Sequence, residues 1–264
     1  MKHFIILAGL LILALSATAQ TESPEQLIEK IVQVDKLQRE QLKNLVLLSE
    51  YIKGEEKDDG TFEEKIRFKK RISIKYLADT ALMHEEYLSC VKEGKPQGDK
   101  DCQKSADEDQ EKKKRRATPG ISFPMVKPFY PEKRSIYTIS YKGIAGERVN
   151  GYLCYHFNVT ANEPADTLLN GDYFFDTESL HLVRVTFSPS QLVSRTMFKM
   201  SKMNMALNYL PTAEGFWLPT EFSFNMKAKA MWIINVPTSA TETYTEPIIN
   251  GGVPDALFEV KDGK

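Results

Sequence analysis

The hydrophobic positions that follow residue 23 recur at the spacing of an amphipathic helix. Charged and amide side chains separate them, as is typical of a helix that packs by one face. The segment Ser23-Pro24-Glu25-Gln26 supplies an N-cap, a first-turn proline and the glutamine of a capping box. The sequence therefore predicts a helix from about residue 24 to residue 44. Its apolar positions are Leu27, Ile31, Val34, Leu37 and Leu45.

After this helix the period changes to two, which indicates strands with one buried face. Such alternation occupies 66–76, 137–141, 153–159 and 171–187, the last with a turn at Asp176-Thr-Glu-Ser179, and 82–91 could form a further strand. The longest alternation runs from 222 to 236, with charged or polar residues at the other parity as far as Lys229. Its apolar positions are Phe222, Phe224, Met226, Ala228, Ala230, Trp232, Ile234 and Val236. One helix followed by many strands predicts a curved antiparallel sheet with the helix on its concave side.

The segment 94–118 interrupts this rhythm with Asp, Glu, Lys and Gln and ends in Lys112-Lys-Lys-Arg-Arg116. A basic docking patch is one interpretation. A solvated, mobile loop, whose acidic first half offsets its basic second half, is the interpretation that we favour.

The first residues have the pattern of a secretory signal peptide. A basic start at Lys2 leads into an apolar run from Phe4 to Leu15, and Ala17-Thr-Ala19 forms a small-x-small cleavage site. The run is shorter than the roughly 20 apolar residues that span a bilayer. We therefore expect residues 1–19 to be removed and residues 20–264 to form a single exported domain that does not span the membrane.

Composition and motifs argue against several classes of function. The net charge is −1, so nothing indicates nucleic acid as a partner. No nucleophile elbow, phosphate loop or set of residues with metal-ligand spacing is present in the sequence. We predict a protein that is not an enzyme and that has no cofactor and no metal.

Three cysteines in an exported protein favour one disulfide and one remaining thiol. Cys90 and Cys102 flank a hydrophilic stretch, which favours a bond between them. Cys154 lies in an alternating apolar segment and is expected to be a buried thiol.

Three segments together resemble the periplasmic proteins that sort outer-membrane lipoproteins. Gly171-Asp-Tyr-Phe-Phe-Asp176 with Leu182–Phe187 is similar to their strand, Asp turn, strand hairpin. Gly215-Phe-Trp-Leu-Pro219 is similar to a Gly-x-Trp-x-Pro step before a long strand, and Gly151–Phe157 to the strand before the hairpin. The resemblance implies an α+β fold in which the curved antiparallel sheet forms an incomplete β-barrel with an N-terminal helix packed on its concave side.

The same resemblance implies an apolar cavity for a lipid or a lipoprotein acyl chain. We therefore predict a periplasmic, non-enzymatic carrier of an apolar ligand. The alternative is a structural or protein-binding envelope factor, including the stress-sensing type, whose barrel core is filled. The predicted cavity residues are Phe222, Phe224, Met226, Ala228, Ala230, Trp232, Ile234, Tyr155 and Phe157.

Overall fold

The computed structural model describes residues 22–57, 59, 61–77, 81–98, 126–231 and 234–258. The expected signal peptide 1–19 and residues 99–118 of the charged segment lie outside this range. Within it there is one α-helix, α1 (Pro24–Gln41), and three short 3₁₀-helices at Lys127–Phe129, Pro131–Lys133 and Asp255–Leu257. The strands are β1 (Asn44–Glu56), β2 (Phe62–Tyr76), β3 (Ala81–Lys92), β4 (Lys95–Pro96), β5 (Tyr137–Ile144), β6 (Cys154–Ala161), β7 (Leu169–Asp176), β8 (Leu182–Pro189), β9 (Ser194–Arg195), β10 (Phe198–Pro211), β11 (Trp217–Ala230) and β12 (Ile234–Ile249).

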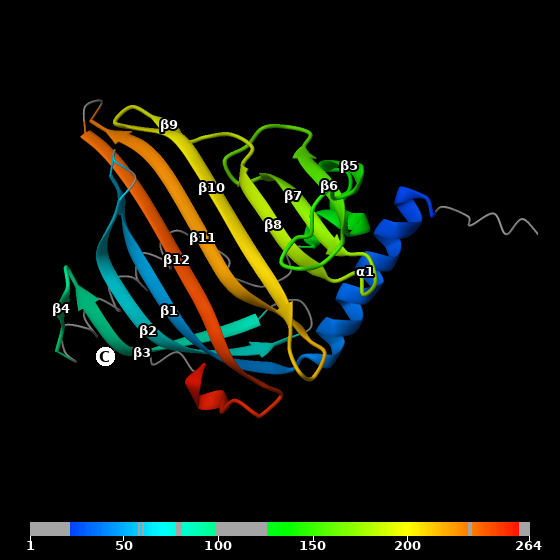
Figure 1. Ribbon diagram of the computed structural model, residues 1–264, viewed down its shortest axis with the longest axis horizontal. Helices are drawn as coiled ribbons and strands as arrows, with labels where there is room; N and C mark the ends of the chain where they lie inside the picture. Colours follow the sequence, from blue (N-terminus) through cyan, green and yellow to red (C-terminus); the bar gives the residue numbers. More distant parts are fainter. Residues whose placement is uncertain are drawn as a thin grey trace, which may run out of the picture.

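All twelve strands belong to one curved antiparallel sheet, which does not close into a barrel (Figure 1). Its order is β4-β3-β2-β1-β12-β11-β10-β8-β7-β6-β5, and β9 pairs with β10 beside this path. Two meanders therefore meet where the first strand pairs with the last, in a register that includes Ser49 opposite Tyr244. The predicted architecture of a curved sheet with an N-terminal helix is confirmed.

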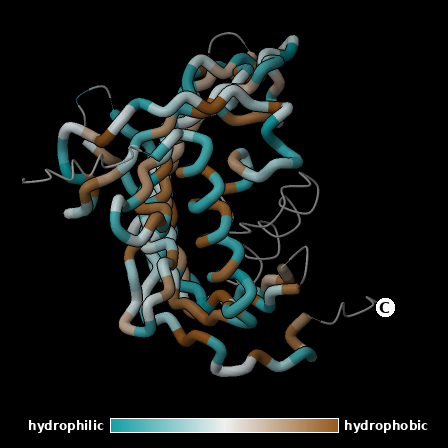
Figure 2. Tube along the Cα trace, turned by 90° about the vertical axis from the view of Figure 1, so that its right-hand side faces the viewer, coloured by the Kyte–Doolittle hydropathy of each residue, from teal (hydrophilic) through white to brown (hydrophobic). Residues whose placement is uncertain are grey.

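The helix α1 lies against one face of the sheet, seen edge-on in Figure 2. The predicted capping box is present: Gln26 N donates to Ser23 Oγ at 3.2 Å, and Ser23 N donates to Gln26 Oε1 at 3.1 Å. The helix ends at Gln41 rather than at 44, because Leu42 is already extended. The buried side chains lie in the first half of the helix, whereas Leu37, predicted on the packed face, is 46% exposed. The buried side chains of the helix are Leu27, Ile28, Ile31 and Val32.

An aromatic cluster fills the space beneath the first half of α1. The Phe129 ring makes edge-on contacts with the rings of Phe157, Tyr173 and Phe175, at centroid distances of 5.5, 5.2 and 5.2 Å. All four side chains are almost completely buried. Edge-to-face pairs of this kind add about 0.5–1.5 kcal/mol each to the burial of the rings.

Two of the long strands, β1 and β10, were not recognised from the sequence, nor were the two-residue strands β4 and β9. The segment 44–56, whose first residue was assigned to the helix, forms β1. Its alternation, which buries Leu45 and Leu47, was missed because the apolar run from Leu45 to Leu48 hides it. Residues 198–211, for which no strand was predicted, form β10.

The alternation 222–236, read as one strand, is a hairpin in the structure. The strand β11 ends at Ala230, Met231 has a positive φ of 49°, and β12 begins at Ile234. Ala230 and Ile234 are opposite one another, so both occupy the same face of the sheet. Because the two paired positions are four residues apart, an even number, apolar residues at every second position stay on the same face on both sides of the turn. The alternation in the sequence therefore continues from one strand into the next.

Of the predicted disulfide, Cys102 lies outside the described residues, so the bond from Cys90 to Cys102 stays a prediction. Cys154 is a free and fully buried thiol, as expected. Burial raises its pKa to about 11, so the thiol is neutral at physiological pH.

The inner face of the β1–β2–β12 region contains a buried ionic network instead of a helix contact. Lys70 Nζ lies 2.7 Å from Glu242 and 3.2 Å from Glu85, and its side chain is only 4% exposed. Ser49 Oγ donates to Glu242 Oε1 at 2.5 Å. Tyr51 and Tyr87 place their rings 5.6 and 5.9 Å from the ammonium group. One cation therefore contacts two buried carboxyl groups on this half of the sheet.

We expect Lys70→Met to lower the free energy of unfolding by about 3–5 kcal/mol, because it leaves buried carboxylates without their cation. Lys69→Met is the matched control. Lys69 is exposed on the other face, and its loss should change stability by no more than about 0.5 kcal/mol. Urea unfolding of both variants measures the difference, and equal stability of the two would contradict the assigned role of Lys70.

Candidate functional site

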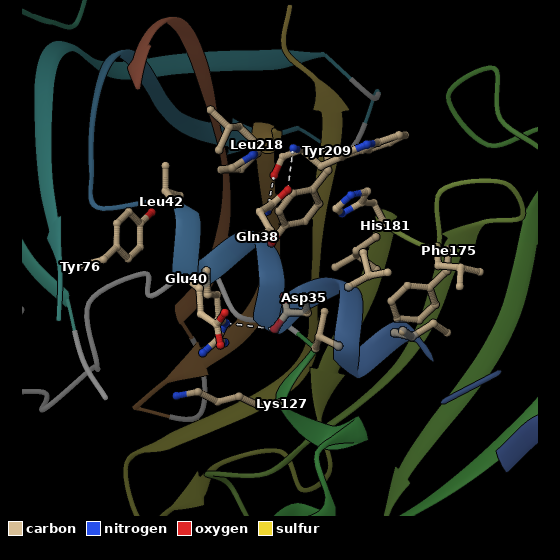
Figure 3. Close-up of a pocket in the computed structure, with 18 of the residues that line it drawn as sticks. Asp35, Gln38, Glu40, Leu42, Tyr76, Lys127, Phe175, His181, Tyr209 and Leu218 are labelled. Carbon is tan, nitrogen blue, oxygen red and sulfur yellow. Dashed lines mark hydrogen bonds and ion pairs between the residues drawn. The ribbon is translucent and has the colours of Figure 1, made fainter. Parts of the chain in front are cut away.

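A cavity of about 470 Å³ lies between the second half of α1 and the sheet (Figure 3). Its wall is contributed by α1, the end of β2, the turn between β7 and β8, and the strands β10 and β11. The volume falls within the range of about 300–1,000 Å³ that is usual for small-molecule sites. The apolar side chains of the wall are Ile31, Val34, Leu42, Leu77, Ala81, Val126, Phe175, Leu180, Leu182, Trp217, Leu218 and Pro219.

The side chain of Gln38 fixes the second half of α1 to the start of β11. Gln38 Nε2 donates to the carbonyl oxygen of Trp217 at 3.1 Å, and the Trp217 N–H donates to Gln38 Oε1 at 2.8 Å. The side-chain amide thus pairs with the backbone of Trp217 as a neighbouring strand would. These two bonds hold the helix beside the cavity although few of its side chains are buried there.

A polar group on the helix forms a second part of the wall. Asp35 accepts a hydrogen bond from the Tyr130 hydroxyl at 2.6 Å and pairs with Arg39 Nε at 3.0 Å. Burial raises the pKa of Asp35, and the arginine and the tyrosine partly oppose that effect. The guanidinium group also lies 5.5 Å from the centre of the Tyr130 ring.

Tyr76, at the end of β2, contributes a buried hydroxyl group that is not hydrogen-bonded within the described residues. Its ring lines the cavity (Figure 3), and its hydroxyl is buried with no hydrogen-bond partner within the described ranges. Burial raises the pKa of this phenol far above its usual value, so the group remains protonated and can donate. An unsatisfied buried hydroxyl costs about 1–3 kcal/mol.

His181, in the turn immediately before β8, lies in the wall next to Trp217. The two rings are stacked, with centroids 5.6 Å apart and planes 18° from parallel. Burial lowers the pKa of His181 to about 4, against a smaller opposing effect of Asp176. The imidazole is therefore neutral at physiological pH and forms part of a mostly apolar surface.

Eight of the nine residues predicted for the cavity belong to the described part of the chain, and these eight do not line this space. Phe157 is fully buried in the aromatic cluster, and Tyr155 packs at the edge of that cluster. Phe222 packs between the two main cores, and Ile234 is 50% exposed at the start of β12. Trp232 lies outside the described residues. Phe224, Met226 and Ala230 are half-buried on β11, and Ala228 is buried.

One segment that the sequence analysis noted for another reason does border the cavity. The segment Gly215–Pro219, noted for its resemblance, contributes Trp217, Leu218 and Pro219 to the wall. No sequence pattern marked Tyr76 or the polar residues in the second half of α1 as part of a cavity. Each of them is an ordinary position in an amphipathic strand or helix.

A second hollow of about 860 Å³ is more open, and its lining mixes polar and apolar side chains. It runs across β6–β8 and β10–β12 and includes Asn158, Asp172, Arg184, Asn204 and Asn225. Arg184 Nε and Asn225 Oδ1 are buried there without a partner in the described part of the chain. Phe224, one of the residues predicted for the cavity, lines this hollow.

Two features are absent from the described residues. No group of three or more His, Cys, Asp or Glu side chains in those ranges could hold a metal ion. No helix there is both long enough and apolar enough to cross a bilayer.

No protein-family model matches the sequence, and no curated protein is similar to it. Among solved structures, the chain is similar to a DUF1329 family protein from Desulfovibrio piger, with 13% identity over 89% of this chain and 95% of that chain and a TM-score of 0.41. It is also similar to a putative outer membrane lipoprotein-sorting protein domain from Vibrio parahaemolyticus, with 11% identity over 88% and 97% and a TM-score of 0.39. A LolA superfamily protein from Nitrosomonas europaea matches with 9% identity over 88% and 97%, also at a TM-score of 0.39.

The pKa of His181 predicts a pH-dependent stability. In the unfolded chain a histidine takes up a proton near pH 6.5, whereas in the folded protein His181 does so only near pH 4. Its contribution is therefore complete above about pH 6.5 and is lost as the pH falls to about 4. Because the side chain is partly exposed, we expect this loss to lower the free energy of unfolding by about 2 kcal/mol.

Urea unfolding at pH 7 and pH 4.5 tests this expectation. His181→Gln should lose less stability than the parent protein between the two pH values, whereas His84→Gln, outside the cavity, should follow the parent. The raised pKa of Asp35 acts in the opposite direction, so the comparison is made between variants. Identical pH profiles of the parent and His181→Gln would contradict the burial of a neutral imidazole.

Proposed function

We propose that this protein binds and carries an amphipathic ligand with an apolar chain, such as a lipid or an acyl chain, in the cavity between α1 and the sheet. The observation on which the proposal rests is the cavity of about 470 Å³ with twelve apolar side chains in its wall. Its place of action, in this proposal, is the cell envelope, in agreement with the N-terminal pattern of a secretion signal. No catalytic step is proposed.

The charged side chains of the wall indicate which end of the ligand is polar. Arg39, Lys43 and Lys127 line the cavity together with Asp35 and Glu40. Three cations and two anions leave a surplus of one positive charge. A carboxylate or phosphate group beside these side chains would gain charge-assisted hydrogen bonds, while the chain of the ligand would contact Phe175, Leu182, Leu218 and Trp217.

The alternative, a protein-binding factor with a filled interior, is favoured by one observation. The space under the first half of α1 is occupied by the aromatic cluster of Phe129, Phe157, Tyr173 and Phe175. Within the described ranges, the cavity of about 470 Å³ lies beside the second half of the helix. The experiments below therefore address that part.

A fluorescent fatty acid, dansylaminoundecanoic acid, tests the cavity directly. We expect the parent protein to bind it in the micromolar range and palmitate to displace it. Val34→Phe should weaken binding at least about tenfold, because the new ring occupies the cavity. The unfolding free energy should change little, since the ring enters open space rather than a packed core.

Leu37→Phe is the matched control, because Leu37 lies on the same helix, is 46% exposed and does not line the cavity. It should bind the probe as the parent does. Failure of the parent to bind the probe, or equal loss in both variants, would refute the carrier function and favour the filled-interior alternative.

Tyr76→Phe tests whether the cavity recognises a polar group. Without ligand, we expect the variant to be about 1 kcal/mol more stable than the parent, because an unsatisfied buried hydroxyl is removed. Affinity for the fatty-acid probe should fall several-fold, whereas affinity for the uncharged probe N-phenylnaphthylamine should not.

Tyr130→Phe serves as the contrast, since it removes a hydroxyl that donates to Asp35. That variant should be destabilised by about 1–3 kcal/mol. A loss of stability in Tyr76→Phe as large as that in Tyr130→Phe would show that the Tyr76 hydroxyl has a partner in the free protein.

A further inference from the structure

Four lysines form two like-charged pairs on the outer face of the hairpin β10–β11. Lys199 is directly opposite Lys229, and Lys202 is directly opposite Lys227. A register shift between Met200 and Lys202 keeps both pairs on the same face, because it restores the alternation after one extra residue. All four side chains are exposed, and none of them makes an ion pair within the part of the chain that the structure describes. Like charges in directly opposite positions destabilise a sheet.

The other half of the same sheet shows the opposite arrangement. On β2, Arg71 is directly opposite Glu86 on β3 and forms an ion pair with it at 2.6 Å. Arg67 pairs with Glu64 at 2.6 Å and with Glu50 at 3.4 Å. Arg67 and Arg71 on β2 thus have carboxylate partners, whereas the four lysines on β10 and β11 face each other. Near the lysines, the carboxylate of Glu56 accepts a hydrogen bond from Asn225 Nδ2 at 3.3 Å, so one anion borders the patch.

Exposed apolar side chains lie at the end of the same hairpin. Met197, Met231 and Ile234 are 60%, 55% and 50% exposed. Met231 N donates to the Met197 carbonyl oxygen at 2.8 Å, which brings the two methionines together at one tip. In Figure 1 this tip, where β9 and the ends of β10–β12 lie, is at the far end of the long strands from α1.

The two features are close enough to act on one surface. Lys227 precedes Met231 by four positions, which is about 13 Å along a strand. Lys229 is two positions away. These separations are comparable to the Debye length of about 10 Å at 0.1 M salt. If the apolar tip enters the boundary between headgroups and acyl chains, the lysines reach the plane of the phosphate groups.

We propose that the β9–β12 tip, defined here as Met197, Met231, Ile234, Lys199, Lys202, Lys227 and Lys229, is a docking surface for an anionic lipid bilayer. Apolar side chains at the tip and lysines behind it are the combination that binds such surfaces peripherally. An acidic protein would satisfy the lysines and leave the exposed methionines unexplained. The proposal does not depend on the ligand of the cavity, which lies at the other end of the sheet.

Sedimentation with lipid vesicles tests this docking surface. The full chain is mixed with vesicles of phosphatidylcholine containing 30% phosphatidylglycerol, or with pure phosphatidylcholine, in 0.1 M NaCl. We expect binding to the anionic vesicles only, with a strong decrease at 0.5 M NaCl. K227Q/K229Q should lower the partition coefficient about 30-fold, and K227R/K229R should restore it.

The matched control is K133Q/K142Q, which removes the same charge from two exposed lysines near β5. It should change binding by less than about twofold. M197S/I234S should weaken binding to anionic vesicles while leaving the lysines in place. The N-terminus is identical in all variants, so binding through residues 1–19 would be the same in each.

Near-UV circular dichroism confirms that each variant is folded. Equal binding of the parent to neutral and anionic vesicles would overturn the proposal. So would equal loss in K227Q/K229Q and K133Q/K142Q, or no binding by the parent. The cavity variants Val34→Phe and Tyr76→Phe should bind vesicles as the parent does, which separates this test from that of the carrier function.

Discussion

The difference in length between one helix and one wide sheet governs this structure. At 1.5 Å per residue, the 18 residues of α1 extend about 27 Å, enough to cover roughly six strands spaced about 4.8 Å apart. The sheet has twelve strands. The covered part is filled by aromatic side chains, a cavity opens where the buried face of the helix ends, and the inner face of β1, β2 and β12 is stabilised by Lys70 and its two carboxyl partners. Core, cavity and ionic network follow from this one limit.

Much of the fold could be predicted from the sequence because its signals are local. The capping box of α1, the Asp176 turn and the alternation in β2 and β6–β8 each depend on neighbours within a few residues. The failures are local as well. The apolar run Leu45–Leu48 conceals β1, and the hairpin at Met231 preserves the parity of two, so its two strands look like one.

The cavity was harder to predict because its wall combines single residues from distant elements. Val34, Tyr76, His181 and Trp217 come from four separate parts of the chain, and periodicity shows only the face to which each belongs. Periodicity also cannot distinguish a filled interior from an open one. Phe157 and Phe222 were correctly expected to be apolar positions of the sheet. Which apolar positions border the cavity depends on where α1 ends, and the periodicity of the strands does not show this.

The pairing of β1 with β12 affects how the chain can fold. Ser49 on β1 and Glu242 on β12 are 193 positions apart in the sequence. The contacts between these two strands therefore have a high contact order. The two meanders can form from neighbouring strands, but their inner edges stay open until the C-terminal strand is available. Closure of such a long loop is entropically slow. We therefore expect the joining of the two half-sheets to be a late step of folding.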